Sequence, residues 1–510
     1  MSLLIGEIVR LAARMVPDTV AATLAGDRIT FGELDRKANR TANALAGLGV
    51  RAGDRVAWST APTLRTLDAF LGCARLGAVF VPVNPALSAA EAAAVLAYLE
   101  PRLLVVDRDV EPPGVPLART GAAGGGVDLD ELTARARPSP PAGAGRLADT
   151  DPHIVYLTSG STGRPKGALV SHRASWLRAA PGGGTFTSGI RGTGGVLCSF
   201  PLYHYGGWHY VLEAWQNRTA VHLVPRADAA RLIDVVHAER PAALYCIPAV
   251  WERLLDPEHR RADLSSLQHA DTGTSALPAD LVDRIKRRLP GTTTTILYGS
   301  TEAGRMAALA DVDLARKAGS VGRPAFPGAL WVDAGPAGDA GPGGTTVGRV
   351  GEVLVTGPAL MSGYHRLPAE TAAALPDGVY RSGDLGRLDE EGYLYLTGRL
   401  REVIRTGGES VAPVEVETAL RGLAGVVDLA VVGLPDDRWG EVVCAVLVLA
   451  HGAPHPDVET VRAHVAGRLA GFKQPRRVVV LPAIPRTTAT GQVQRSRIRA
   501  ALAGGTDLRG

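Results

Sequence analysis

The chain has 510 residues, with 46% hydrophobic and 21% charged side chains and a formal net charge of +4 at pH 7. This length is too great for one hydrophobic core and predicts at least two domains. The small net charge, without a basic arm or stripe, excludes a nucleic-acid partner. Four cysteines without a C-x-x-C spacing exclude a zinc or disulfide framework.

No signal peptide or membrane span is expected. The N-terminal residues lack a charged segment followed by a long apolar one. The apolar stretch over 69–83 is too short to span a bilayer and is interrupted by Arg75 and Pro82. Together with the scarce cysteines, which suit reduced thiols, this pattern predicts a cytoplasmic protein that does not bind membranes.

Short apolar segments alternate with helical ones along the first hundred residues. We expect strands at 55–58, 77–83 and 103–106, and this alternation predicts a mainly parallel, doubly wound sheet. Residues 112–148 are rich in Gly, Pro and Ala and are expected to form a loose connection without a helix or strand. The alternation then returns, with expected strands at 220–224 and 243–247 and an amphipathic helix over 279–289.

The pattern changes from residue 351 onward. Segments 352–355 and 393–396 are expected strands of a β-rich subdomain, and an α+β pattern follows Arg401. There, Pro413 begins a helix, strands are expected at 429–433 and 442–449, and a second helix carries Val458 to Leu469. We therefore predict an α/β protein with a large N-terminal domain over 1–400 and a small, mobile C-terminal domain over 401–510.

One loop has the composition of a phosphate site. Residues 158–167 read Thr-Ser-Gly-Ser-Thr-Gly-Arg-Pro-Lys-Gly. Glycines let backbone N–H groups approach a phosphate, hydroxyl groups donate hydrogen bonds, and Lys166 supplies a positive charge. The Walker spacing is absent, and by composition alone a flexible surface loop is the alternative.

The full string resembles the signature loop of the adenylate-forming superfamily, which includes acyl-CoA synthetases, peptide-synthetase adenylation domains and beetle luciferases. Other segments support this resemblance across nearly the whole chain. It implies that the loop binds the nucleotide through Thr158, Ser159, Gly160, Ser161, Thr162 and Lys166.

Two further segments resemble nucleotide contacts of this family. In Tyr298-Gly299-Ser300-Thr301-Glu302, the resemblance implies a tyrosine stacked on adenine, a phosphate-contacting Thr301 and a magnesium-binding Glu302. A tyrosine face suits a purine and a carboxylate suits Mg²⁺, although alone the segment could be a turn after a strand. Asp271 to Ser275 resembles the loop that contacts adenine, with Thr272, Gly273 and Thr274, and forms one wall of the acyl pocket.

The C-terminal part resembles the family at the ribose contacts and the hinge. Asp384 matches the aspartate that holds both ribose hydroxyls, and Arg399 matches a second ribose or phosphate contact; each could instead be a surface residue. Arg401 occupies the hinge position about which the C-terminal domain rotates. Gly408, within Thr406 to Glu409, is implied to lie beside the pantetheine arm of CoA.

The acyl pocket is expected around residues 201–208. His204 matches an aromatic-or-histidine position at the boundary of the acyl and pantetheine sites, where it would act as a gate or orient the carboxylate; a structural role is the alternative. Gly206 and Gly207 are expected to leave volume for a bulky or polycyclic acid, with fatty and aromatic acids still open. The other expected pocket residues are Trp208, Trp251 and Met306, of which the last two are equally compatible with the core.

The C-terminal departure from the family is Gln492. Members that adenylate a carboxylate have a lysine directly after a glycine here, where two anions meet and a cation offsets the charge on phosphorus. This chain has Thr490-Gly491-Gln492, and the run from Pro485 to Gly491 is one residue longer than usual.

We therefore predict a ligase that joins a preformed acyl-adenylate to CoA and releases AMP. A separate adenylating ligase would supply the adenylate, and ATP and Mg²⁺ would serve only if adenylation is retained. The alternatives are a complete ATP-dependent acyl-CoA synthetase, an adenylation protein that loads a carrier protein, and a non-catalytic adenylate-binding protein. A homodimer is compatible with the resemblance.

Overall fold

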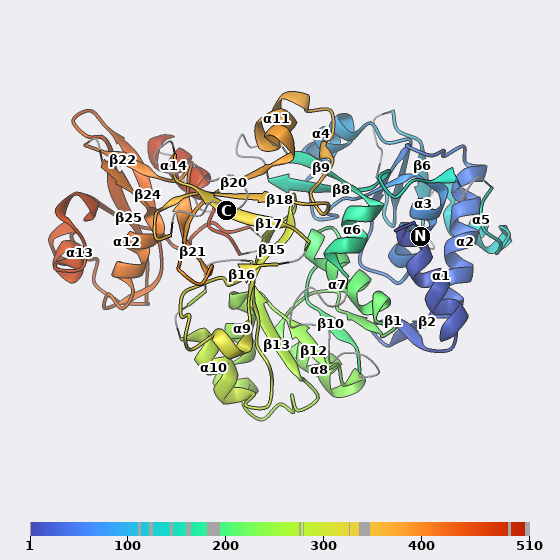
Figure 1. Cartoon of the computed structure of the whole chain (residues 1–510), viewed down its shortest axis with the longest axis horizontal. Coiled ribbons are helices and arrows are strands. Elements are labelled where there is room, and N and C mark those ends of the chain that lie inside the picture. Colours follow the sequence, from blue (N-terminus) through green and yellow to red (C-terminus); the bar gives the residue numbers. More distant parts are fainter. Residues whose placement is uncertain are drawn as a thin grey trace. The chain divides into compact units, whose positions relative to one another are not determined.

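The computed structural model describes residues 2–110, 114–121, 126–142, 146–159, 165–180, 194–274, 277–278, 280–325, 327–335, 347–407, 409–487 and 491–504. The chain forms two compact units (Figure 1). The first comprises Met1–Ala318, Gly322–Ala329 and Val355–Tyr380, and the second comprises Gly319–Val321, Leu330–Leu354 and Arg381–Gly510.

The first unit contains two large mixed sheets. One sheet has the strand order β16-β15-β14-β13-β12-β10-β11-β1-β2 and is parallel from β14 to β1. Its strands are β1 (Val20–Leu24), β2 (Asp27–Thr30), β10 (Val196–Cys198), β11 (Val221–Leu223), β12 (Ala243–Tyr245), β13 (His269–Gly273), β14 (Ile296–Ser300), β15 (Gly304–Leu309) and β16 (Arg323–Pro324).

The other sheet has the order β19-β9-β8-β4-β3-β5-β6-β7 and is parallel from β8 to β7. Its strands are β3 (Arg55–Ser59), β4 (Val79–Pro82), β5 (Leu103–Val106), β6 (Leu117–Arg119), β7 (Val127–Asp128), β8 (Pro152–Ser159), β9 (Pro165–Ser171) and β19 (Gly363–Tyr364). The predicted α/β fold with mainly parallel sheets is confirmed.

Helices connect and cover these strands. They are α1 (Ile5–Met15), α2 (Phe31–Gly47), α3 (Arg65–Leu76), α4 (Ala89–Leu99), α5 (Leu129–Arg135), α6 (His172–Arg178), α7 (Tyr205–Gln216), α8 (Ala229–Glu239), α9 (Pro248–Leu254), α10 (Leu281–Arg288) and α11 (Pro368–Ala374). The expected amphipathic helix over 279–289 is α10.

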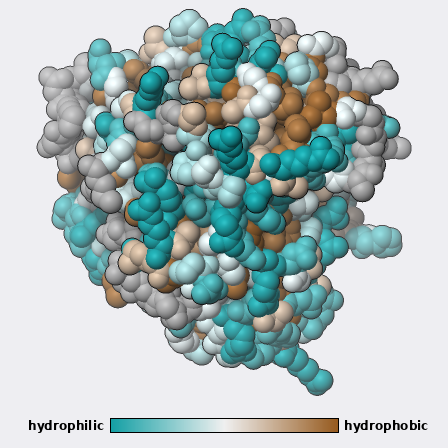
Figure 2. Space-filling view, turned by 90° about the vertical axis from the view of Figure 1, so that its right-hand side faces the viewer, coloured by the Kyte–Doolittle hydropathy of each residue, from teal (hydrophilic) through white to brown (hydrophobic). Residues whose placement is uncertain are grey.

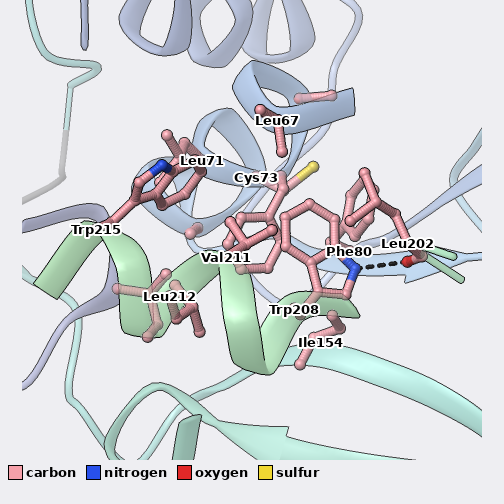
Figure 3. Packing of buried hydrophobic residues seen from close by; sticks show 14 of the residues in the cluster. Leu67, Leu71, Cys73, Phe80, Ile154, Leu202, Trp208, Val211, Leu212 and Trp215 are labelled. Atoms are coloured by element: carbon pink, nitrogen blue, oxygen red, sulfur yellow. Dashed lines mark hydrogen bonds between the residues drawn. The ribbon is translucent and has the colours of Figure 1, made fainter. Parts of the chain in front are cut away.

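The main core of the first unit draws residues from both large sheets. Trp208 of α7 is fully buried and stacks on Phe70 of α3, with 3.9 Å between the ring centroids. Figure 3 shows Trp208 among other buried side chains of this core. Phe80 of β4 and Ile154 of β8 lie around the pair, and Trp208 Nε1 donates to the carbonyl of Leu202 at 2.6 Å. Large aromatic surfaces with a satisfied N–H dominate the energetics of such a core.

Residues 112–148 contain regular structure, so the expectation of a loose connection is wrong. Strand β6 pairs with β5 in register Leu104↔Leu117, and helix α5 begins after Asp128. The Asp128 carboxylate caps α5 by accepting the N–H groups of Asp130 and Glu131, and Leu129 is fully buried. An N-cap and a buried leucine outweigh the Gly, Pro and Ala composition of the surroundings.

The second unit carries a four-stranded sheet, in which β20 and β21 are antiparallel, and an α+β fold. The sheet order is β17-β18-β20-β21, with β17 (Ala329–Asp333), β18 (Gly351–Thr356), β20 (Tyr380–Leu388) and β21 (Leu394–Arg399). The remaining elements are β22 (Ile404–Thr406), β23 (Glu409–Val411), α12 (Pro413–Leu420), β24 (Val426–Asp436), β25 (Gly440–Leu449), α13 (Val458–Val465), β26 (Arg477–Val480) and α14 (Arg495–Gly504).

The boundary between the compact units differs from the expected one at Arg401. The hairpin β20–β21 pairs within itself and continues the sheet of β17 and β18, so residues 381–400 belong to the second unit. Leu423 and Leu469 follow the ends of α12 and α13 but are buried in the same cluster as those helices. The hinge at Arg401 stays a prediction.

The structure also bears on thiols and membranes. All four cysteines are buried, and none forms a disulfide. Among the described residues, no helix has both the length and the apolarity needed to cross a bilayer.

Acid should destabilise the first unit through a buried histidine. His172 accepts the Ile5 N–H at Nδ1 and stacks on His153, and burial lowers its pKa to about 4, against the opposing pull of Asp151 and Asp149. Because the folded-state pKa lies below the ordinary 6.5, the stabilisation is complete above pH 6.5 and is lost as the pH falls through 4. The loss for this group is on the order of 3 kcal/mol.

Urea midpoints measured from about pH 7 to about pH 4 check this expectation. His172→Asn keeps an acceptor for the Ile5 N–H but removes the titrating ring. The urea midpoint of this variant should therefore fall less with falling pH than the midpoint of the parent protein. An unchanged slope in that variant would contradict the assignment.

Candidate active site

The predicted phosphate loop connects two antiparallel strands of the first unit. β8 ends at Ser159 and β9 begins at Pro165, with Thr158 opposite Lys166 in the ladder. Thr158 Oγ1 donates to the carbonyl of Lys166 at 3.3 Å. Gly160, Ser161 and Thr162 lie outside the described residues, as does the side chain of Ser159. Two predicted contacts, Thr158 and Lys166, are thus brought to the base of one hairpin loop.

Lys166 and Glu302 are linked by a residue that the sequence analysis missed. The Lys166 ammonium lies 5.1 Å from the centroid of the Tyr364 ring, and the Tyr364 hydroxyl donates to Glu302 Oε1 at 2.9 Å. Strand β19 places Tyr364 beside β9 in register with Ala168. No local sequence signal connects Tyr364 with a residue 62 positions away.

Glu302 lies in the turn between β14 and β15, so the segment is indeed a turn after a strand. Gly299 faces Arg305 across this hairpin, and a Cβ at Gly299 would come within 2.2 Å of the Gly304 carbonyl oxygen. The Glu302 carbonyl accepts the Met361 N–H at 2.7 Å, and Tyr298 is buried. A single carboxylate suits a Mg²⁺ that is held mainly by nucleotide phosphates and water. Glu302 therefore fits the predicted metal contact, and Mg²⁺ bound there would offset phosphate charge.

The segment after β13 is held in an unusual backbone conformation. Gly273 has φ +148°, and a Cβ there would lie 2.1 Å from the Leu297 carbonyl oxygen. Thr274, a β-branched residue, has φ +72° and is held by a 2.7 Å hydrogen bond between its hydroxyl and that of Tyr245. Thr272 is fully buried. Positive φ in a β-branched residue indicates strain maintained by its surroundings, which is common at binding sites.

Trp251 supports this segment from behind. Its indole N–H donates to the Asp271 carbonyl at 2.8 Å, and the side chain is fully buried in a cluster with residues of α8 and α10. Of its two interpretations, wall of the acyl pocket or core, the structure favours the core. Met306 of β15 is also buried, and its role stays a prediction.

His204 is the N-cap of α7. Its Nδ1 accepts the Gly206 N–H at 3.1 Å, and its ring stacks on Phe200 with 5.5 Å between centroids. Burial lowers the pKa of His204 to about 4, so the imidazole is neutral at physiological pH. With Nδ1 accepting, the ring proton is assigned to Nε2, where it can donate to a carbonyl or carboxylate oxygen.

Gly206 and Gly207 allow α7 to pack closely against the preceding segment and do not leave volume for an acyl group. A Cβ at Gly206 would lie 2.9 Å from the Phe200 ring, and one at Gly207 would lie 2.7 Å from the Pro201 carbonyl oxygen. Trp208 is fully buried and stacks on Phe70 in the core. The expectation that these three residues open or line an acyl pocket is therefore wrong, because α7 lies too close to the preceding segment.

In the second unit, the predicted ribose contacts form a pair. Asp384 of β20 lies opposite Arg399 of β21, and Arg399 Nε is 2.9 Å from Asp384 Oδ1. Arg401 lies two residues after Arg399 and is exposed. The Asp384 carboxylate is mostly buried, whereas 54% of the Arg399 side chain is exposed. Arg399 is therefore placed to contact a ligand while it orients the carboxylate.

The predicted pantetheine loop lies between β22 and β23. Gly408 lies outside the described residues. Its neighbour Gly407 has φ +60°, and a Cβ there would lie 2.7 Å from Trp439, whose carbonyl accepts the Gly407 N–H at 2.9 Å. Arg438 and Arg476 lie 5.1 Å and 4.2 Å from the Trp439 ring centroid. No motif in the sequence marks this cluster of two arginines around a tryptophan ring.

Gln492 lies on a closed hairpin. Its N–H donates to Thr487 Oγ1 at 3.0 Å, and its carbonyl accepts the Thr487 N–H at 2.8 Å. Gly491 has φ +67°, and Arg486 pairs with Val493. Both backbone groups of Gln492, its N–H and its carbonyl, are therefore hydrogen-bonded to Thr487. Thr490 lies outside the described residues.

Family models match both parts of the chain. One described as "AMP-binding enzyme" matches residues 9–365, and one described as "AMP-binding enzyme C-terminal domain" matches residues 415–491. The chain is 34% identical to an indoleacetate–CoA ligase of Aromatoleum aromaticum, with 96% of both proteins covered. It is 35% identical to a feruloyl-CoA synthase of an Amycolatopsis species, again with 96% of both covered.

Solved structures show the same architecture. ATP-bound MatB from Rhodopseudomonas palustris matches with a TM-score of 0.84 and 27% identity, over 99% of this chain and 100% of that one. The o-succinylbenzoate CoA synthetase MenE from Bacillus subtilis, in complex with its acyl-adenylate intermediate, matches with a TM-score of 0.83 and 25% identity, over 96% and 97%.

Gly207→Ala should destabilise the protein, because the added methyl group meets backbone and not open space. We expect a loss of about 1–3 kcal/mol in the free energy of unfolding, measured by urea denaturation. Gly291→Ala, where nothing lies within 4 Å of the added Cβ, is the matched control and should change stability little. Equal stability of the two variants would restore the interpretation of Gly207 as pocket space.

Proposed function

The chain belongs to the AMP-binding enzyme family, and we propose that it is an acyl-CoA ligase specialised in forming the thioester from a preformed acyl-adenylate. In this step, the sulfur of CoA forms a bond to the acyl carbon. The bond from that carbon to the phosphate oxygen breaks, AMP leaves with the electron pair, and the thiol proton is released. Two relatives that match 96% of the chain are named as a CoA ligase and a CoA synthase, which supports this reaction class.

The observation that carries the proposal is the neutral side chain at position 492. Adenylation brings a carboxylate to the α-phosphate of ATP, and the charge on phosphorus rises in the transition state. Gln492 can donate a hydrogen bond but brings no positive charge to this step. Loss of one preorganised donor typically costs about 10²–10³ in rate.

Two cations of the second unit, Lys473 and Arg495, are held in ion pairs. Lys473 is the one lysine in that unit's sequence, and its ammonium lies 2.5 Å from Glu415 Oε1. Arg495 forms ion pairs with Glu402 at 2.7 Å and with Glu417 at 2.6 Å, and only 12% of its side chain is exposed. Moving either cation to the α-phosphate would break a buried or close ion pair, so neither is a ready substitute.

The groups that the thioester step needs are present. Tyr298 and Thr301 would hold the adenine and phosphate of the adenylate, and Asp384 with Arg399 would hold its ribose. His204, neutral and carrying its proton on Nε2, would orient the acyl carbonyl. Arg438 and Arg476 beside Trp439 would attract the phosphates of CoA, since a guanidinium pairs well with phosphate oxygens.

A complete ATP-dependent ligase is the second candidate, because the Lys166–Tyr364–Glu302 arrangement retains groups suited to ATP phosphates and Mg²⁺. Under the first proposal, the enzyme works in the cytoplasm and depends on a separate ligase that supplies acyl-adenylate. The substrate we propose is an aromatic carboxylic acid, as in the names of the indoleacetate and ferulate relatives.

Two assays separate the candidates. The purified protein receives indoleacetic or ferulic acid with ATP, Mg²⁺ and CoA, and in parallel the corresponding synthetic acyl-adenylate with CoA alone. We expect rapid thioester formation only from the adenylate. ATP–pyrophosphate exchange driven by either acid, as fast as the thioester step, would establish the complete ligase instead.

Gln492→Lys should raise the rate of adenylation by about 10-fold or more, because a protonated amine would offset the charge that develops on phosphorus. ATP–pyrophosphate exchange measures this gain, and the thioester rate should stay within about twofold. Gln494→Lys adds the same charge two residues away and is the matched control. If neither lysine raises exchange, position 492 does not have the assigned role.

Arg476→Ala should raise the KM for CoA by about three- to tenfold and leave the KM for acyl-adenylate unchanged, because one cation beside Trp439 is lost. Steady-state kinetics with each substrate varied in turn test this. Arg468→Ala removes an exposed arginine elsewhere in the second unit and should leave both constants unchanged. An equal rise in both KM values for Arg476→Ala would refute a specific contact with CoA.

A further inference from the structure

A buried arginine anchors the predicted phosphate-binding turn from behind. Arg178, the last residue of α6, is only 3% exposed. Its guanidinium donates three hydrogen bonds to backbone carbonyls: Nη1 to Thr301 at 3.0 Å, Nη2 to Glu302 at 2.7 Å and Nε to Ala359 at 2.7 Å. Two of these carbonyls belong to the residues predicted to contact phosphate and Mg²⁺.

The same guanidinium also contacts α7. It lies 5.2 Å from the centroid of the Tyr205 ring, directly after the N-cap His204. Its stem crosses Gly304, which has φ +74°, and a Cβ there would lie 2.9–3.0 Å from side-chain atoms of Arg178. Arg178 thus joins the β14–β15 turn, the segment at Ala359 and the start of α7.

The energetics argue against a purely structural role. No carboxylate forms an ion pair with Arg178 among the described residues, so the charge is balanced by backbone dipoles, the Tyr205 ring and the longer-range field of Glu302. Burial lowers the pKa of Arg178, which measures the cost of keeping this cation out of water. A buried cation without a carboxylate is expensive, and a functional site is where such a cost is commonly retained.

We propose that Arg178 is a positioning residue for the adenylate: it fixes Thr301 and Glu302 against α7 and places a buried positive charge behind the phosphate. This inference rests on the proposed adenylate site. Removing Arg178 would leave three carbonyls without their donor, and the turn would relax away from the geometry that binds phosphate. The ligand affected is AMP or acyl-adenylate, and CoA binding should not depend on this residue.

The chain offers a matched control. Arg75 of α3 lies in the same unit, is 7% exposed, and donates to Asp35, Asn39 and the Gly6 carbonyl. None of these partners belongs to the predicted site. Arg178→Lys and Arg75→Lys make the same chemical change in two buried arginines, so their comparison separates positioning from general stability.

The test measures AMP affinity by titration calorimetry alongside the melting temperature of each full-length variant. We expect Arg178→Lys to weaken AMP binding at least tenfold and to raise the KM for acyl-adenylate without changing the KM for CoA. Arg75→Lys should lower the melting temperature to a similar extent with AMP affinity within twofold of the parent. Gly304→Ala, which displaces the guanidinium without removing it, should weaken AMP binding in the same direction.

Three outcomes would count against this inference, and they are distinguishable. If folded Arg178→Lys or folded Gly304→Ala binds AMP within twofold of the parent protein, Arg178 does not position the site. If Arg75→Lys weakens AMP binding as much as Arg178→Lys, the effect is one of stability, and the inference also fails. A parent protein that does not bind AMP would overturn the proposed function itself, and the inference with it.

Discussion

The stack of Trp208 on Phe70 is the contact on which the arrangement of the first unit depends. It joins α7 to α3 at 3.9 Å between ring centroids, inside a core that takes residues from both large sheets. Because this core is continuous, the turns at the ends of β8 and β14 are held by one packed body. The close approach of α7 also explains why Gly206 and Gly207 cannot be larger and why His204 can cap the helix.

Charge is distributed unevenly in the candidate site. On the first unit, Lys166, Glu302 and the buried Arg178 surround the turn assigned to phosphate, and Tyr364 connects the first two. On the second unit, the C-terminal hairpin carries the neutral side chain of Gln492. The proposed preference for a preformed adenylate rests on this neutral side chain, because adenylation develops negative charge that a cation would offset.

Sequence patterns predicted much of the fold because strands and helices of this chain carry periodic, local signals. The strands at 55–58, 103–106 and 220–224 are confirmed as β3, β5 and β11. The Gly, Pro and Ala composition of residues 112–148 led to the wrong prediction of a loose connection. The N-cap at Asp128 and the buried Leu129 stabilise a helix there. The site motifs also located the facing pair Asp384 and Arg399. The pocket assignments failed at Gly207 and Trp208, because the residue type alone does not show whether a glycine or a tryptophan lines a cavity or packs in the core.

The sequence by itself determined which chemical groups the chain can bring to a reaction: the Gly- and Thr-rich loop with Lys166, the turn with Glu302, the carboxylate and guanidinium of Asp384 and Arg399, and a neutral side chain at position 492. These are local strings, and their residue types carry the information. Only the tertiary structure decided that Tyr364 holds Glu302 and that Arg178 anchors Thr301, because those contacts join residues 62 and 123 positions apart. Packing brings such residues together, and which way each side chain faces depends on neighbours that no local pattern names.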